Sequence, residues 1–266
     1  MSELKAIFIL FTTFIIHFAV PTVNAGSDFD LLIFTQQWPA TACKEWKKHN
    51  PSHTCSMPKN SETWTIHGIW PTKMGMIGPA FCNRTWFFDP EKIRPIEEEL
   101  LQKWPNIYGG TSEYALWSHE WAKHGTCAAI LKPLNSELNY FQNGLEFLKT
   151  FTMTDILEKN SIVPSNTEKY TVADIHDAIK QRVNKNPVIE CKVEEGGDNY
   201  ISEIRICFTK ELQLTDCDGV VTQKYGYGGI LTNCHSTRGI IYPQYKKYIW
   251  YVELYKLLTW LQWFTL

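Results

Sequence analysis

The sequence contains no stretch rich in glycine, serine and proline that would be typical of a linker, and it has no internal repeat. About 240 residues remain once the amino-terminal segment described below is removed. That length is enough for one substantial hydrophobic core and does not indicate a second. We therefore expect a single domain.

An excess of positive charge is also missing. Lysine and arginine total 26, aspartate and glutamate total 28, and the formal net charge is −2. This balance excludes a polycation that binds phosphates by charge alone. Seven of the eight histidines lie beyond the amino-terminal segment, and their protonation would turn the net charge to +5 while the carboxylates stayed ionised. An acidic compartment could thus direct the protein towards a polyanion.

The apolar run at the amino terminus, residues 6–20, is too short to span a membrane. It is followed by PTVNAG, in which Val23 and Ala25 have the spacing of a small-residue cleavage site. Residues 1–25 are therefore predicted to be a secretory signal peptide, and the alternative is a short buried hydrophobic helix. An exported protein is expected.

Eight cysteines follow this segment, and an even count in an exported chain indicates disulfides. Composition leaves about 105 pairings open. Asn83 begins the sequon Asn-Arg-Thr and is the candidate glycosylation site, because Asn50 is followed by Pro51.

The arrangement of apolar residues predicts an α+β fold with a mainly antiparallel central sheet, several packed helices and disulfide staples. The pairs Asp89–Pro90 and Thr171–Asp174 are typical of helix beginnings. Strands are expected over 28–39, 62–71, 188–194, 200–210 and 239–243, and helices over 90–103 and 113–127, after Ser136 and after Thr171.

The segment ALWSHEWAKHGTC, residues 115–127, concentrates titratable groups. A helical zinc site of the His-Glu-x-x-His type needs a second histidine four residues after His119, and Lys123 stands there instead. His124 is five residues away, roughly 140° around an α-helix. A zinc protease is therefore excluded by spacing.

The same side chains suit proton transfer. On an α-helix Glu120 lies near Lys123 and His124, and His119 is also a neighbour of Lys123. These side chains can supply a base, an acid and a positive charge that stabilises a phosphorane. The alternative is a solvated helix face, but the flanking tryptophans, Trp117 and Trp121, favour a partly walled site.

A second candidate group lies in WTIHGIWP, residues 64–71. Strict strand alternation would place His67 with Thr65 and Ile69 on one face, and Trp64, Ile66 and Trp70 on the other. A single strand histidine is commonly a core residue, but combined with residues 115–127 it supplies an acid–base group from a separate element. The neighbouring tryptophans could stack on bases.

WTIHGIWP and SHEWAKHGTC closely resemble the two active-site segments of the ribonuclease T2 family, in the same order and about fifty residues apart. FTQQWP, residues 34–39, resembles the opening strand of that family. The resemblance covers residues 28–243. It implies a domain over residues 26–243 in a secreted or lysosomal endoribonuclease, with residues 244–266 as an extension.

The resemblance implies a role for each residue. His67 corresponds to the general acid that protonates the 5′-oxygen, and His124 to the base that takes the 2′-hydroxyl proton. His119 corresponds to a phosphate-holding histidine. Glu120 and Lys123 correspond to the pair that stabilises the pentacovalent phosphate.

The implied reaction converts single-stranded RNA to 2′,3′-cyclic phosphates and then to 3′-phosphates. DNA is excluded because the 2′-hydroxyl is the nucleophile. No metal and no other cofactor is implied, and a monomer is expected. Trp70 would form a wall of the base pocket, while Thr72 departs from the usual Asp or Asn of the family and leaves base preference open. Gln36 or Gln37 could contact the second base, and Gln37 is the candidate retained.

The implied disulfides are Cys43–Cys55, Cys82–Cys127, Cys191–Cys234 and Cys207–Cys217. The extension has apolar residues at helical spacing, which predicts an amphipathic helix folded on the domain or lying on a membrane surface. Glu253 and Lys256 disfavour a spanning helix and a removable lipid-anchor signal. The competing functions are a secreted binding protein that keeps the fold and a metal-dependent hydrolase.

Overall fold

The structure is a computed structural model that describes residues 28–221, 228–235, 237–245, 255 and 257–260. The predicted signal peptide, residues 1–25, lies outside the described residues. So does most of the predicted extension, residues 244–266.

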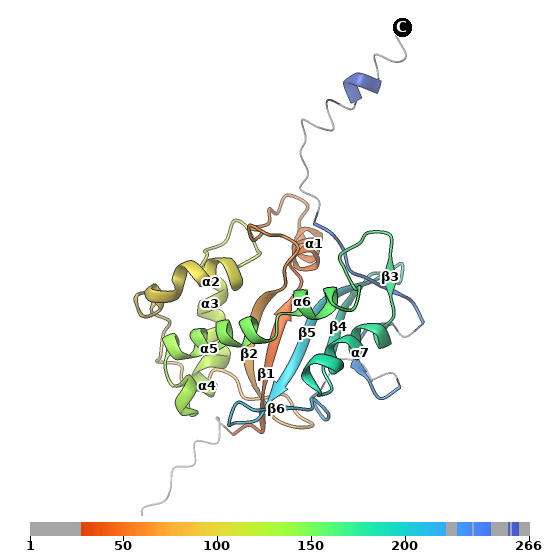
Figure 1. The fold of residues 1–266 in the computed structure, drawn as a ribbon. Coiled ribbons are helices and arrows are strands. Elements are labelled where there is room, and N and C mark those ends of the chain that lie inside the picture. Colours follow the sequence, from red (N-terminus) through yellow and green to blue (C-terminus); the bar gives the residue numbers. More distant parts are fainter. Residues whose placement is uncertain (1–27, 222–227, 236, 246–254, 256, 261–266) are drawn as a thin grey trace, which may run out of the picture.

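A mixed sheet with the strand order β2-β1-β5-β4-β7 forms the centre of the molecule (Figure 1). Its pairs are antiparallel except β4 with β7 and β5 with β8. The predicted α+β fold with a mainly antiparallel sheet is thus confirmed. The strands are β1 (Leu31–Gln37), β2 (Thr65–Thr72), β3 (Lys169–Tyr170), β4 (Val188–Val193), β5 (Asn199–Phe208), β6 (Leu214–Thr215), β7 (Leu231–Thr232) and β8 (Ile240–Ile241).

Two of the helices, α5 and α7, begin where the sequence places caps. The Ser136 side chain accepts from the Asn139 N–H, and Thr171 and Asp174 form a reciprocal capping box. Two helices, α1 and α6, were not predicted. The helical segments are α1 (Pro39–His49), η1 (Pro90–Ile96), α2 (Glu97–Lys103), α3 (Ala115–Glu120), η2 (Trp121–Gly125), α4 (Thr126–Ala128), η3 (Lys132–Leu134), α5 (Glu137–Thr150), α6 (Met153–Glu158) and α7 (Val172–Val183).

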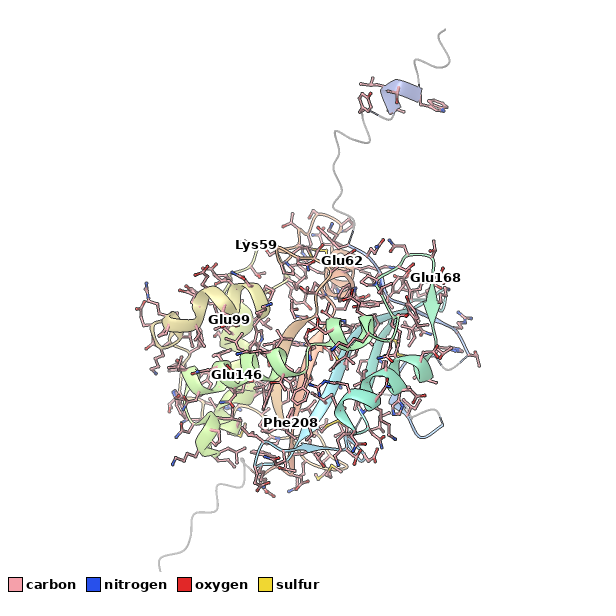
Figure 2. The ribbon with its side chains drawn as sticks, in the orientation of Figure 1. Lys59, Glu62, Glu99, Glu146, Glu168 and Phe208 are labelled. Carbon is pink, nitrogen blue, oxygen red and sulfur yellow. A yellow bond between two sulfur atoms is a disulfide. The ribbon has the colours of Figure 1, made fainter. Side chains whose placement is uncertain are left out.

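The two faces of the sheet differ in what covers them. Alternate residues of β1 and β5 point into the main core beneath α5, α6 and α7 (Figure 1). Phe208 of β5, labelled in Figure 2, stacks on Phe147 of α5 with ring centroids 4.3 Å apart. The opposite face carries a smaller apolar cluster that includes Ile33 and Cys207. The polar side chains of the candidate site lie on that second face.

Four disulfides hold loops and strand ends to this framework. They are Cys43–Cys55, Cys82–Cys127, Cys191–Cys234 and Cys207–Cys217, the same four pairs that the resemblance implies. The second of them links the loop after β2 to α4.

In the carboxy-terminal extension, the described residues Tyr255 and Leu257–Trp260 are helical. Tyr255, Leu257, Leu258 and Trp260 are each more than half exposed. Of the helices in the described part of the chain, none is both long enough and apolar enough to cross a membrane.

Candidate active site

A β-bulge sets the direction of His67. The register of β1 against β2 shifts between Thr35 and Gln36, which leaves His67 as the extra residue on β2. His67 and Trp70 consequently share one face of the strand, with ring centroids 5.1 Å apart in an edge-to-face arrangement. The Trp104 indole N–H donates to the His67 carbonyl at 2.8 Å and fixes the backbone of the bulge.

The bulge corrects the predicted alternation of β2. Strict alternation assigned Trp70 to the face of Ile66 and Ile69 to the face of His67. In the structure Ile66 and Ile69 are both fully buried in the main core, and Trp70 is half-buried beside His67. One extra residue reverses the faces beyond it because side chains alternate with a period of two.

A helix that contains a π-helical turn carries the other candidate site residues. The helix that begins with α3 widens over η2, Trp121–Gly125, and the Thr126 N–H bonds to the Trp121 carbonyl five residues earlier. Gly125 permits this turn, because a Cβ there would lie 2.3 Å from the Trp121 ring. The predicted helix over 113–127 is therefore present but not uniformly α-helical.

The π turn is wider than the α-helix that the sequence predicts between His119 and His124. In an α-helix residues five apart point in different directions, whereas an i to i+5 turn places them about one turn apart. His119 and Lys123 lie close enough to His124 to lower its pKa, in addition to the larger effect of burial. The structure thus brings together all three of these side chains.

His67 is bound at Nδ1 by a carboxylate that sequence reasoning missed. Glu203 of β5 accepts this bond at 2.7 Å, so Nδ1 carries the hydrogen and Nε2 faces the Glu120 carboxyl, 3.9 Å away. Burial alone would lower the pKa of His67, but the charges of Glu203 and then Glu120 outweigh it, and the pKa is raised. The only sequence signal was YISEIRICFTK, where Glu203 and Arg205 alternate with buried isoleucines.

Glu120 is almost completely enclosed, with 1% of its side chain exposed. Its Oε2 accepts a hydrogen bond from the Trp70 indole N–H at 2.8 Å, and its Oε1 points towards the His67 ring. Burial raises the pKa of this carboxyl to about 7, against the opposing influence of His67, Trp70 and Lys123. Near neutral pH the group can therefore exist in either protonation state.

His124 also lies against the Trp70 ring, with centroids 5.4 Å apart. Its Nδ1 is buried without a hydrogen-bond partner. Burial, followed by the positive charges of Lys123 and His119, lowers the pKa of His124 to about 2. His119 is exposed, and partial burial and then Lys123 lower its pKa.

Two imidazoles with opposite pKa shifts therefore lie against one indole ring. His67 holds a proton more firmly than a free histidine, and His124 holds one less firmly. Environments that push two titratable groups apart in pKa define an acid and a base. The arrangement can donate a proton from one imidazole and accept one at the other.

The predicted substrate-binding residues lie near this centre in different settings. Thr72 is buried at the end of β2, and its hydroxyl donates to the Trp70 carbonyl at 3.1 Å. Gln36 is fully buried and binds the α5–α6 junction through Phe151 and Met153. Gln37 is half-buried, and its side-chain amide donates to the Ile66 carbonyl at 3.4 Å.

The sequon residue Asn83 is exposed in the loop before η1. Its side-chain oxygen accepts from both the N–H and the hydroxyl of Thr85, at 3.1 and 2.9 Å. Within the described residues, no group of three His, Cys, Asp or Glu side chains is placed to hold a metal ion.

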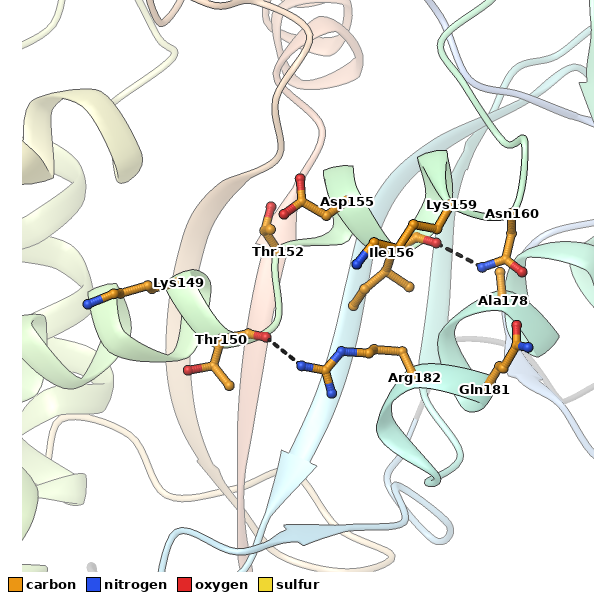
Figure 3. Close-up of a pocket in the computed structure, with 10 residues that line it drawn as sticks. All are labelled: Lys149, Thr150, Thr152, Asp155, Ile156, Lys159, Asn160, Ala178, Gln181 and Arg182. Atoms are coloured by element: carbon orange, nitrogen blue, oxygen red, sulfur yellow. Dashed lines mark hydrogen bonds between the residues drawn. The ribbon is translucent and has the colours of Figure 1, made fainter.

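The cavity drawn in Figure 3 is a separate feature. It encloses about 510 Å³ between α5, α6 and α7 and includes Lys149, Asp155 and Arg182. The Arg182 guanidinium donates to the Thr150 carbonyl at 3.3 Å. None of the predicted site residues lines this cavity.

Residues 29–217 match the model of the Ribonuclease T2 family. Ribonuclease Oy of Magallana gigas is 37% identical over 194 residues, which is 72% of this chain and 88% of that protein. Ribonuclease T2 of Homo sapiens is 36% identical over 190 residues, 70% of this chain and 69% of that protein. Extracellular ribonuclease LE of Solanum lycopersicum is 30% identical over 211 residues, 78% of this chain and 88% of that protein.

Solved structures give the same result. RNase NT in complex with 5′-AMP superposes with a TM-score of 0.67 at 31% identity, over 82% of this chain and all of that one. Human RNase T2 gives 0.63 at 32% identity, over 81% of this chain and 98% of that one. Fold and sequence together define an endoribonuclease. The chain belongs to the ribonuclease T2 family.

Proposed function

We propose that this endoribonuclease cleaves single-stranded RNA by attack of the 2′-hydroxyl, without a metal ion, as a monomer. The observation that carries this proposal is the pair of imidazoles with opposite pKa shifts that both lie against the Trp70 ring. Both are needed for a reaction that removes a proton from one oxygen and gives a proton to another.

In the first step His124 takes the proton of the 2′-hydroxyl, and the 2′-oxygen attacks the adjacent phosphorus. The bond to the 5′-oxygen breaks, and that oxygen leaves with a proton from His67. The product is a 2′,3′-cyclic phosphate. In the second step the two histidines exchange roles, and water opens the ring to a 3′-phosphate. DNA lacks the nucleophile and cannot react.

Residues of α3 and η2 stabilise the negative charge of the transition state. Lys123 supplies a positive charge to the phosphorane oxygens, and His119 holds the phosphate from its exposed position. The pKa of Glu120 is raised to about 7 by burial, so its carboxyl is mostly neutral at acidic pH. A neutral carboxyl can donate to a phosphorane oxygen, whereas a carboxylate would repel it.

Aromatic and amide groups around this centre are proposed to bind the bases of the substrate. Trp70 offers the indole as a wall against which a base can stack. The Thr72 hydroxyl donates its hydrogen to the Trp70 carbonyl, so towards a base this hydroxyl can act only as an acceptor. Gln37 faces the second base.

An acidic lumen of the secretory or lysosomal system is the proposed compartment. Four disulfides suit an oxidising compartment, and a mostly neutral Glu120 favours acidic pH.

Asn83 is proposed to carry a glycan. If so, the secreted protein loses mass on endoglycosidase treatment, and Asn83→Gln does not.

The test uses a defined oligoribonucleotide at mildly acidic pH with excess chelator. We expect a 2′,3′-cyclic phosphate product, and no cleavage of a matched oligonucleotide with a single 2′-deoxy sugar at the cut site. His67→Phe and His124→Phe should each lower kcat by about 10²- to 10⁴-fold. His49→Phe, at an exposed position of α1, is the matched control. Activity that disappears on chelation, or persists in both variants, contradicts the proposal.

A further inference from the structure

We propose that Glu203, held in place by Arg205, is a positioning residue that orients the His67 ring for proton donation. This inference rests on the proposed role of His67 as general acid. It assigns a function to two residues of β5 that lie outside both active-site segments of the sequence.

The contact crosses the sheet. Glu203 stands opposite Gln37 on β1, and Gln37 stands opposite Thr65 on β2, so β1 lies between Glu203 and His67. Neighbouring strands are about 4.8 Å apart, so the two side chains must lean towards each other over β1. The bulge at His67 aims the ring in this direction, and the carboxylate oxygen lies 2.7 Å from Nδ1.

Each oxygen of the Glu203 carboxylate has a separate partner. Oε1 accepts from His67, while Oε2 accepts from Arg205 Nη2 at 2.6 Å and Nε at 3.2 Å. Arg205 is fixed in turn by Glu190, whose Oε1 is 3.1 Å from Nη1, and by Trp70, whose ring lies 5.2 Å from the guanidinium carbon. Glu203 therefore has little freedom to turn away from the imidazole.

This pairing fixes the His67 tautomer. A carboxylate can only accept, so Nδ1 is the protonated nitrogen in the neutral ring, and Nε2 is the nitrogen that gains and loses the transferred proton. Nε2 faces Glu120, on the side where α3 and η2 place the phosphate-binding groups. The Glu203 bond thus selects the nitrogen that faces the substrate.

The pairing with Glu203 also affects the protonation of His67. The charged and titratable groups that act on His67 are Glu203 and Arg205 of β5 and Glu120 of α3, and those on which it acts include His119 and His124. Burial favours the neutral ring, and Glu203 is the strongest influence in the other direction. Burial would raise the pKa of Glu203 itself, but His67 and Arg205 outweigh it and lower that pKa, so the carboxylate stays ionised.

The test is Glu203→Gln, which keeps an oxygen acceptor at similar length but removes the charge. The acid must be protonated to act, so its pKa contributes to the alkaline limb of the pH profile of kcat/KM, together with the pKa of Glu120. We expect this limb to move to lower pH by about one unit or more. Activity should therefore fall more at neutral than at acidic pH. A role limited to folding would lower activity equally at all pH values.

Glu194→Gln is the matched control, because it removes a surface ion pair with Lys44 at 2.8 Å and should leave the limb unchanged. A direct readout is the NMR titration of the His67 ring in the wild-type protein and in Glu203→Gln. We expect the wild-type pKa to exceed that of an ordinary histidine and the variant pKa to be lower. An unchanged limb together with equal His67 pKa values overturns the proposal.

The two proposals fail in different ways. If the wild-type protein does not form cyclic phosphates, the proposed function is wrong, but the titration of His67 still tests its pairing with Glu203. If Glu203→Gln does not fold, the wild-type titration decides alone. A His67 pKa at or below the ordinary value then contradicts the inference.

Discussion

His124 combines a buried, unpartnered Nδ1 with the neighbouring side chains of Lys123 and His119, and burial followed by these neighbours lowers its pKa to about 2. In an unfolded chain the pKa of histidine is about 6.5. Between these values the unfolded state binds a proton that the folded state does not, so stability falls as pH falls. His67 and Glu120 have raised pKa values and act in the opposite direction, which partly offsets this loss.

Removing the imidazole should therefore make the protein less sensitive to acid. In His124→Phe, the free energy of unfolding should change less between about pH 7 and pH 5 than in the wild type, by roughly 1–2 kcal/mol. Urea unfolding at both pH values measures the difference. His49→Phe should show the wild-type dependence on pH, and parallel curves for His124→Phe would contradict the buried neutral state.

At the scale of secondary-structure elements, the bulge in β2 depends on a residue without a side chain. A Cβ at Gly68 would lie 2.0 Å from the Glu120 Oε2 and 2.2 Å from the Trp70 Nε1. Both atoms belong to the hydrogen bond that joins β2 to α3. No substitution at position 68 can leave this bond in place.

Gly68→Ala should consequently lower the free energy of unfolding by about 2–3 kcal/mol, through overpacking and the loss of a buried hydrogen bond. Activity should fall by about 100-fold because His67 and Glu120 move relative to each other. Thermal unfolding and cyclic-phosphate formation measure the two effects. Gly196→Ala is the matched control, because a Cβ there meets nothing within 4 Å. Equal behaviour of the two variants would show that the bond is dispensable.

The bulge and the π turn also explain why the directions of the site's side chains could not be predicted from the sequence. Caps are local, so Ser136 and Thr171 predicted the beginnings of α5 and α7. A bulge depends on the register of a partner strand, and nothing in residues 64–71 reveals that register. The widening of η2 likewise depends on how the Trp121 ring packs against Gly125. The residue types were therefore predicted, but their directions were not.

The pairing of Glu203 with His67 could not be predicted from the sequence for a related reason. The two residues are 136 positions apart and meet across an intervening strand. Alternation in YISEIRICFTK could indicate that Glu203 and Arg205 share a face, but not which side chain they contact. Motifs record neighbours along the chain, whereas this contact depends on the strand order of the whole sheet.

At the scale of the whole molecule, the site is assembled from parts that separate loops and strands hold in place. The Phe81 N–H bonds to the Lys123 carbonyl at 2.9 Å, which joins the loop after β2 to η2. The adjacent disulfide, Cys82–Cys127, ties the same loop to α4 and closes 45 residues. Cys43–Cys55 closes only 12 residues and joins α1 to the chain that follows it.

Removal of the two disulfides should therefore have different effects on the free energy of unfolding and on activity. Chain-entropy arguments give about 4 kcal/mol for Cys82→Ala/Cys127→Ala and about 3 kcal/mol for Cys43→Ala/Cys55→Ala. The larger difference should lie in activity, because only the first pair is attached to the segment that carries Lys123 and His124. Measured below the unfolding temperature of each variant, cleavage of RNA should fall at least tenfold in the first double variant and remain near wild type in the second. Activity near wild type in both would mean that the π turn keeps its geometry without the covalent link, and that the packing of Trp121 alone positions the base.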